Sequence, residues 1–194
     1  MGVVHNRRVM HESFELIEHA RRRLKEQGLP CTIAGGASDA AIDAAEEALA
    51  CTFPPSYRAF LRSFGAVTMP ARVSTIPHLI GLDAKASEGD AEKDVVQRTL
   101  HARVENRLSK HLVIIGLGTE AGEWFCIDVD RVGADGESPI VLFDARDNQL
   151  DQQFYDDFAS MVNEVLTFVL ETLDESSDLG SAARDESSGM LELG

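Results

Sequence analysis

A stripe of apolar residues at helical spacing predicts a helix over residues 12–27. The stripe consists of Phe14, Ile17, Ala20 and Leu24. Gly28 and Pro30 follow, and they end the helix because glycine favours helix ends and proline cannot continue one. A single apolar face indicates that this helix packs against the rest of the chain.

The same spacing predicts three further helices between residues 38 and 108. Ser38 is a good N-cap for the first, whose apolar positions are Ile42, Ala45 and Leu49. Pro54-Pro55 open the second, and Gly65 ends it. Its aromatic stripe, which we interpret as core, consists of Tyr57, Phe60, Leu61 and Phe64. The third is predicted over 94–108, with apolar residues at every fourth position, Val96, Leu100, Val104 and Leu108.

Strands separated by glycine-rich turns are predicted in the middle of the chain. They are Leu112–Ile115, Glu123–Val129 and Pro139–Phe143, after a strand region over 73–82 that Pro77 interrupts. A long helix with a broad apolar face follows over about 154–172. After Leu173 the sequence loses this periodicity, which predicts a disordered acidic tail.

This order of elements favours an α+β fold, because strands and helices do not alternate one for one. We expect a mostly antiparallel or mixed central sheet packed against flanking helices. The predicted organisation is an N-terminal helix and loop over 1–37, a domain over 38–173 on which that helix packs, and the disordered tail over 174–194.

Charge is distributed unevenly along the chain. The net charge is −15, of which residues 1–111 contribute +1 and residues 112–194 contribute −16. An acidic protein repels the phosphates of nucleic acids and anionic lipids, so we expect no binding to nucleic acid or membrane. A basic protein partner is compatible with this charge. The other interpretation is that the acidity only keeps the protein soluble.

The cysteines and the N-terminal segment indicate a cytoplasmic protein. Cys31, Cys51 and Cys126 are odd in number and far apart in sequence, which argues against a disulfide framework and a structural zinc site. Free thiols suit a reducing compartment. The first residues contain no apolar signal-peptide region, and no apolar run has the length of a membrane span.

No complete catalytic or cofactor motif occurs, so we expect neither an enzyme nor a cofactor. Asp128 and Asp130 lie two apart on a predicted strand and therefore on one face, where two carboxylates can hold a divalent cation. No third ligand stands at a matching spacing, so we interpret Asp130 as the start of a turn and predict no metal site. The segment FDARDNQLD is similarly rich in carboxylates but lacks the glycine and terminal glutamate of a calcium loop.

Three segments, in the right order, resemble the SUKH superfamily, whose founding members are the Smi1/Knr4 proteins. The first, Ala45–Val67, has a helix with a glutamate, a proline step and a Tyr-x-x-Phe-Leu motif ending in glycine. The second, His111–Asp130, has a strand, a glycine-rich turn and a strand ending in Ile-Asp. The third runs from Pro139 through the last strand, a polar turn and the closing helix. The resemblance covers about residues 38–170, and the order of the motifs is its most specific property.

The resemblance implies a protein that works by binding another protein. Many bacterial members resemble immunity proteins that neutralise toxins, often nucleases, whereas fungal relatives are regulatory scaffolds. The alanine- and arginine-rich composition favours a bacterial source. The function predicted first is therefore non-catalytic neutralisation of a cognate, basic toxin by direct binding. A regulatory or scaffold module is the alternative, and an uncharacterised enzyme is a distant third.

The acidic C-terminal half is the predicted partner-binding surface. If the strands are antiparallel neighbours, Asp144 lies near Glu123, and the adjoining turns form one acidic rim with Trp124 as an aromatic anchor. The predicted residues are Glu120, Glu123, Trp124, Asp128, Asp130, Asp144, Asp147 and Asp151. The alternative is that these carboxylates are solvated turn residues.

Overall fold

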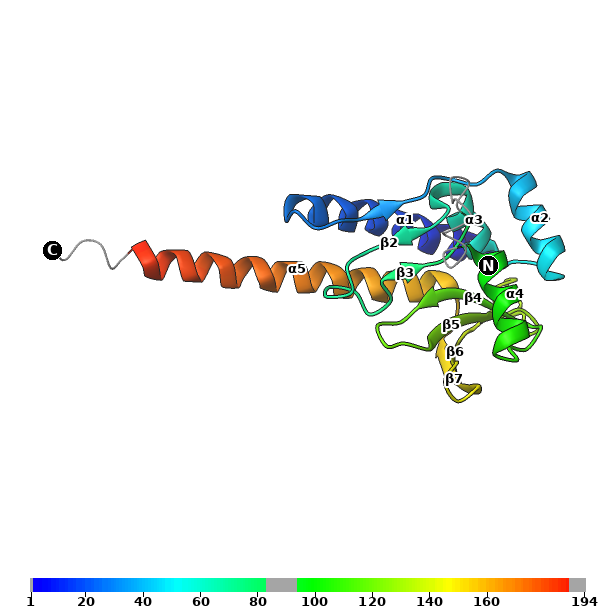
Figure 1. Ribbon diagram of the computed structural model, residues 1–194. Helices are drawn as coiled ribbons and strands as arrows, with labels where there is room; N and C mark the ends of the chain where they lie inside the picture. Colours follow the sequence, from blue (N-terminus) through cyan, green and yellow to red (C-terminus); the bar gives the residue numbers. More distant parts are fainter. Residues whose placement is uncertain (1, 83–93, 189–194) are drawn as a thin grey trace.

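A single antiparallel sheet organises the fold. The computed structural model describes the backbone of residues 2–82 and 94–188, and the side chains of residues 12–82, 94–150 and 152–176. Seven strands lie side by side in chain order from β1 to β7, and every neighbouring pair is antiparallel. The helices flank this sheet (Figure 1). The expected α+β class is confirmed.

Strands and helices alternate irregularly along the chain. The strands are β1 (Thr32–Ile33), β2 (Val67–Thr68), β3 (His78–Leu79), β4 (Leu112–Leu117), β5 (Glu123–Asp128), β6 (Ile140–Asp144) and β7 (Gln149–Tyr155). The helices are α1 (Gly2–Glu26), α2 (Asp39–Leu49), α3 (Pro55–Phe64), α4 (Val95–Glu105) and α5 (Phe158–Ser188). Strands β4 to β6 lie where the alternation predicted them, and β3 lies within the predicted strand region over 73–82. Strands β1 and β2 are too short for a pattern of period two to be recognised.

Helices α1 and α5 lie side by side and run in the same direction (Figure 1). Ile17, Ala20 and Leu24 of the predicted stripe are buried. The side-chain amide of Gln27 donates to the carbonyl oxygen of Leu173 at 2.8 Å, and the Arg23 guanidinium lies 2.5 Å from the Asp174 carboxylate. Contacts between α1 and α5 therefore stabilise both helices.

The aromatic stripe of α3 lies at the centre of the core, which confirms its interpretation. Tyr57 and Phe60 are fully buried. The ring of Phe158 on α5 lies 5.0 Å from the Tyr57 ring and 5.1 Å from the Phe60 ring, measured between centroids. The Tyr57 hydroxyl donates to the carbonyl oxygen of Ile80 at 2.8 Å. This bond satisfies the one polar group that the stripe brings into the core.

A carboxylate from a distant segment caps the N-terminus of α3. Pro54 occupies the N-cap position and makes no side-chain capping bond. Glu137, which is 5% exposed, accepts hydrogen bonds from the Ser56 N–H at 3.0 Å and from the Ser56 hydroxyl at 2.5 Å. Negative charge is favourable here, because the first N–H groups of a helix have no partner within it. The β5–β6 connection thereby fixes α3.

Helix α4 buries a different face from the one predicted. Its buried residues are Val95, Thr99 and Ala102, whereas Leu100 is 38% and Val104 77% exposed. A strict four-residue spacing drifts around a helix of 3.6 residues per turn, so the predicted stripe does not stay on one side. The inward face instead contains Thr99, whose hydroxyl oxygen accepts the N–H of Ile114 in β4 at 3.1 Å.

The predicted last helix begins too early. The chain forms β7 first, and α5 starts at Phe158. The Asp157 carboxylate caps α5 by accepting the N–H of Ser160 at 2.7 Å. Phe154, predicted as the first residue of the helical stripe, lies on β7 and is 44% exposed. Phe154 stands four residues before Phe158, which is a helical spacing. The sequence pattern therefore assigned a strand residue to the helix.

Helix α5 runs beyond its predicted end. The last buried residue among its described side chains is Leu173, where the sequence places the end of the core. The backbone stays helical to Ser188, since an existing helix extends by one hydrogen bond per added residue. Residues 189–194 of the predicted tail lie outside the described residues. Within the described part of the chain, no helix is long and apolar enough to cross a membrane.

Deleting residues 175–194 is expected to leave a stable domain. The reason is that Leu173 and Asp174 already supply the contacts of α5 to the end of α1. Limited proteolysis of the full chain, followed by mass determination of the resistant fragment, checks where the core ends. Loss of cooperative thermal unfolding on deletion would show instead that this segment is structural.

Glycines allow separate segments of the chain to cross at close range. Gly65 has φ +70°, and a Cβ there would lie 2.2 Å from the carbonyl oxygen of Gly35. A Cβ at Gly81 would lie 1.6 Å from the carbonyl oxygen of Gly65. Side chains do not fit at such distances. Glycine is therefore required where the ends of α3, β1 and β3 meet.

All three cysteines are free thiols, as expected. Cys126 is fully buried in β5, and burial raises the pKa of its thiol. Burial also raises the pKa of the half-buried Cys51 thiol to about 11. Because the thiolate is the reactive form, both side chains are poor nucleophiles near neutral pH.

Candidate protein-binding surface

Four of the predicted acidic residues gather at one end of the sheet. We call them the turn cluster: Glu120, Glu123, Asp144 and Asp147. Glu123 at the start of β5 pairs in register with Asp144 at the end of β6, which is the proximity that the sequence predicted. Glu120 and Asp147 are exposed in the adjoining turns. Asp151 lies on β7, and its side chain is outside the described ones.

Backbone contacts hold the two turns together. The Ala145 N–H donates to the carbonyl oxygen of Gly122 at 2.9 Å and so joins the β6–β7 turn to the β4–β5 turn. The Glu123 carboxylate accepts the Glu120 N–H at 3.3 Å. Gly122 has φ +94°, and a Cβ there would meet the Arg146 side chain at 2.9 Å. The carboxylates of the turn cluster are thus presented on an ordered backbone.

Arg146 partly neutralises the turn cluster. Its guanidinium donates to the Asp144 carboxylate through Nε at 3.1 Å and through a terminal nitrogen at 2.8 Å. Another terminal nitrogen lies 3.7 Å from the Glu120 carboxylate. The hydrogen bonds from Arg146, side chain first and backbone second, lower the pKa of Asp144 to about 2. The cluster therefore keeps three net negative charges at neutral pH.

Asp144 is expected to titrate near pH 2 in the folded protein. Its pKa is depressed below the ordinary 3.8, so the pair with Arg146 stabilises the fold fully above that ordinary value. The contribution is lost as pH falls from about 4 towards 2. Carboxylate chemical shifts followed by NMR through this range measure the midpoint. In Arg146→Ala the midpoint should return towards 3.8; an unchanged midpoint would contradict the assigned cause.

Asp128 and Asp130 lie at the opposite end of β5 from the turn cluster. The strand has six residues, which separates its ends by roughly 17 Å at about 3.4 Å per residue. The single rim predicted from the sequence is therefore two separate groups. Asp128 is buried at 5% exposure, whereas the side chain of Asp130 is 78% exposed and lies 4.0 Å from His111 Nδ1. Sequence alternation placed both on one face but did not show that Asp128 is buried there.

Trp124 is a packing residue in this structure. It is 7% exposed and stacks on Phe143, with centroids 5.7 Å apart and planes 20° from parallel. The Arg98 guanidinium of α4 lies 5.2 Å from the ring centroid on the covered face. An aromatic anchor for a partner has to be accessible, and the Trp124 ring is buried instead. Trp124 therefore packs inside the fold next to Glu123 of the turn cluster.

A surface hollow of about 360 Å³ opens beside β7, at the Asp130 end of the sheet. Four carboxylates line it, those of Asp135, Glu137, Asp156 and Asp157. Arg131 also lines it and donates to the side-chain oxygen of Gln153 on β7 at 2.6 Å. The sequence did not predict this hollow, because residues 131–139 meet residues 153–157 only once β7 is recognised as a strand.

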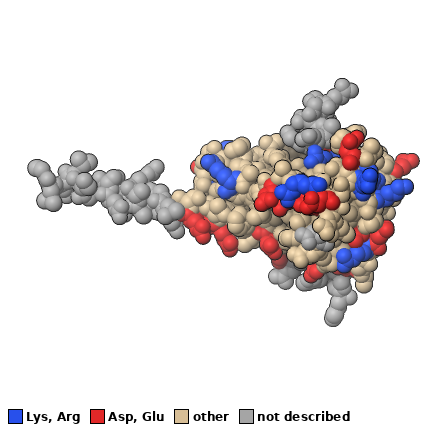
Figure 2. All heavy atoms as spheres, turned by 60° about the horizontal axis from the view of Figure 1, so that its bottom comes forward, with Lys and Arg blue, Asp and Glu red and all other residues tan. Residues whose placement is uncertain are grey.

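The acidic half of the folded chain contains few basic residues. Residues 112–173, from β4 to the last buried residue of α5, include 13 acidic and two basic residues, Arg131 and Arg146, for a net charge of −11. Figure 2 shows acidic and basic groups interspersed over the face that it presents. On this face, basic groups thus divide the acidic ones, and no unbroken acidic field is seen.

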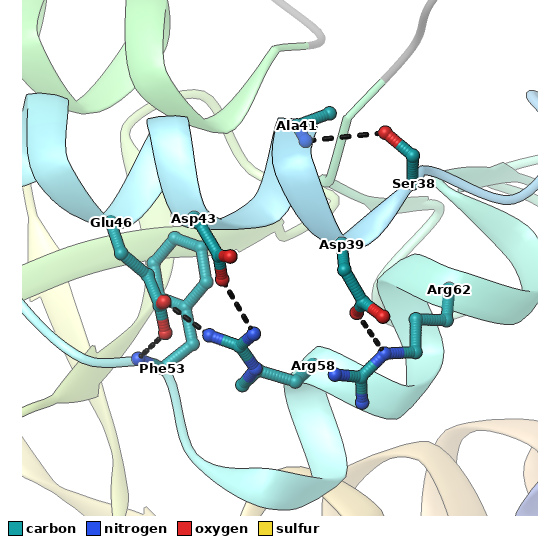
Figure 3. Close-up of polar contacts among 8 residues, drawn as sticks. All are labelled: Ser38, Asp39, Ala41, Asp43, Glu46, Phe53, Arg58 and Arg62. Carbon is teal, nitrogen blue, oxygen red and sulfur yellow. Dashed lines mark hydrogen bonds and ion pairs between the residues drawn. The ribbon is translucent and has the colours of Figure 1, made fainter.

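Three of the four acidic residues of α2 are, by contrast, bound within the fold (Figure 3). Arg58 of α3 contacts the carboxylates of Glu46 and Asp43, the latter at 2.8 Å. Glu46 also accepts the N–H of Phe53 at 2.6 Å, which fixes the turn between the helices. Asp39 pairs with Arg62 at 2.5 Å. The carboxylates in Figure 3 thus hold the helix pair together.

Among the side chains of residues 12–82, 94–150 and 152–176, no group of three or more His, Cys, Asp and Glu is placed to hold a metal ion. The groups that gather at the two ends of β5 are carboxylates with arginine, amide and histidine neighbours. Exposed carboxylates attract cationic groups.

The sequence matches the SMI1 / KNR4 family (SUKH-1) over residues 36–164. This match spans the α2–α3 helix pair, the sheet from β2 to β7 and the start of α5. The chain therefore belongs to the SMI1/KNR4 (SUKH-1) family. This is a family of immunity proteins for polymorphic toxins, and the immunity proteins are generally non-catalytic. A search of curated proteins finds no match.

Proposed function

We propose that this chain is an immunity protein that neutralises a cognate, basic toxin domain in the cytoplasm by direct binding. Family membership supports the class of function. The observation that supports a basic partner is the net charge of −11 on residues 112–173, where only two basic residues occur. Binding to nucleic acid or to an anionic membrane is disfavoured by the same charge.

An acidic inhibitor suits a toxin that acts on nucleic acid. Such a toxin presents cationic groups to phosphates, and carboxylates on an ordered backbone compete for those groups. The turn cluster offers Glu120 on one turn and Asp144 and Asp147 at the adjoining turn, and the hollow beside β7 offers Asp156 at the other end. Complementary charge of this kind accelerates association more than it lowers the final free energy of binding.

Co-expression with a candidate toxin domain, sought first among the products of neighbouring genes, tests the proposal. We expect the chain to restore growth to cells that produce the toxin, and to form a stable complex in size-exclusion chromatography. A chain that forms the complex but leaves the toxin active would be a scaffold instead. Toxicity unchanged by the chain, with no complex formed, would contradict the proposed function.

Changing Asp144, Asp147 and Asp151 together to lysine is expected to slow association with the toxin. Rim charges act mainly on the association rate, so about a tenfold decrease at low salt is expected, together with a flatter salt dependence. Stopped-flow binding over a range of salt concentrations measures both. The matched control changes Glu12, Glu15 and Glu18 on α1, which are exposed and give the same change of charge. Equal behaviour of the two variants would contradict a role for this end of the sheet.

A further inference from the structure

The last strand of the sheet has an unusually accessible edge. Among the residues that the structure describes, strand β7 stands at the end of the strand order and pairs only with β6. It has seven residues, whereas β1 at the opposite edge has two. An edge strand presents a row of N–H and C=O groups that can pair with another chain. Of the two edges, only β7 is long enough to accept several residues of a partner strand.

The protection that edges usually carry is reduced on β7. Proteins commonly shield long edges with lysine or proline, and β7 contains neither. Leu150 is 47% and Phe154 44% exposed, so two apolar side chains stand on the strand in reach of solvent. The register with β6 shifts twice, and Gln152 has no partner residue in it. These shifts twist the strand but leave its apolar residues exposed.

Negative charge surrounds this edge. Asp147 precedes β7, Asp151 lies within it, and Asp156 and Asp157 follow it. The hollow that Gln153 lines lies at the Tyr155 end of β7, and Asp135 and Asp156 are among its lining residues. The two nearest arginines are engaged, Arg146 with Asp144 and Arg131 with Gln153. A strand added here would run between two acidic groups.

We propose that β7 binds an extended, basic segment of the partner protein by strand addition, with one lysine or arginine side chain placed in the hollow beside Gln153. This inference rests on the proposed function for the identity of the partner. Main-chain hydrogen bonds supply the pairing, and alternate side chains of the added strand select for positive charge. Leu150 and Phe154 give that strand an apolar contact.

A second copy of this chain fits the edge poorly. Antiparallel pairing of two β7 strands would bring the aspartates of one copy against those of the other, and like charges across a strand pair are destabilising. The segment Gln149–Asp157 contains three acidic residues, Asp151, Asp156 and Asp157, and no basic one. Charge complementarity therefore selects a basic strand over self-association.

A synthetic peptide of ten alternating lysine and valine residues tests the proposal without the toxin. A second peptide of the same sequence with N-methyl groups on alternate backbone amides keeps the charge but cannot form the ladder. We expect the first to bind the full-length chain at least tenfold more tightly and to slow amide exchange at Gln149–Tyr155. Equal binding of the two peptides, or protection confined to other strands, would overturn strand addition.

Two variants complete the test. Gln152→Lys places a cation on the exposed strand and should weaken binding of the alternating peptide at least tenfold, whereas Val104→Lys makes the same type of change on α4 and should have no effect. A dimer of the unmodified chain in analytical ultracentrifugation, dissociated by Gln152→Lys, would assign the edge to a second copy and overturn the proposal. Neutralisation of the toxin by Gln152→Lys at wild-type affinity would overturn it while leaving the proposed function intact.

Discussion

Replacing Phe60 by alanine is expected to lower the free energy of unfolding by about 3–5 kcal/mol, the range for truncation of buried aromatic residues. Phe60 is fully buried, and its ring packs against Tyr57, Phe64 and Phe158, with centroids 5.1 to 6.1 Å away. The substitution removes a ring from the place where α3 meets α5. Neighbouring rings cannot fill the space without leaving their own packing positions.

Chemical denaturation of the wild-type and Phe60→Ala proteins measures this loss. Phe168→Ala is the matched control, because it deletes the same ring from a position on α5 that is 44% exposed. The control should lose far less stability than Phe60→Ala. If Phe60→Ala is as stable as the parent but fails to bind its partner, the aromatic stripe of α3 belongs to an interface and the assignment to the core is wrong.

Replacing Glu137 by alanine is expected to cost about 2–4 kcal/mol, because hydrogen bonds to a buried charged group contribute about 1.5–3 kcal/mol each and do not add fully. Two donors lose their acceptor, the backbone N–H and the hydroxyl of Ser56. Both lie at the N-terminus of α3, where Pro54 offers no substitute cap. The carboxylate also joins the β5–β6 connection to the helix, so the loss affects two elements.

Glu137→Gln distinguishes the cap from the charge. The amide oxygen can still accept the Ser56 N–H, so Gln should retain part of the stability that Ala loses. Calorimetry of the two variants gives the comparison, and Asp156→Ala, which loses an exposed carboxylate from the same hollow, controls for local charge. Equal loss for Gln and Ala would assign the effect to charge. No loss for either would show that the helix needs no external cap.

The spacing of apolar residues in the sequence correctly predicted those elements in which buried residues recur at a regular period. The stripes of α1, α2 and α3 are buried at the expected positions, because each helix packs with one face inward. Strand β7 was missed for a physical reason: as an edge strand it has few buried side chains, and Phe154 happens to continue the helical spacing of α5. The capping aspartate Asp157 was the available signal for the true helix start.

The candidate site was predictable in part. Pairing of Glu123 with Asp144 follows from the order of antiparallel strands alone. The burial of Trp124 involves α4, which comes from a distant part of the sequence and places Arg98 over the Trp124 ring. Long-range contacts of this kind leave no mark in the local alternation. The hollow beside β7 was missed for a related reason, because it forms only where residues 131–139 meet residues 153–157 in the folded chain.

The pairing of α1 with α5 affects how the chain folds during synthesis. Gln27 and Leu173 are separated by 146 residues, so α1 leaves the ribosome well before the α5 residues that it contacts. Until then Ile17, Ala20 and Leu24 have no α5 to cover them, and nascent chains with exposed apolar faces are substrates for chaperones and prone to association. A message truncated before α5 therefore yields a chain whose α1 stays uncovered.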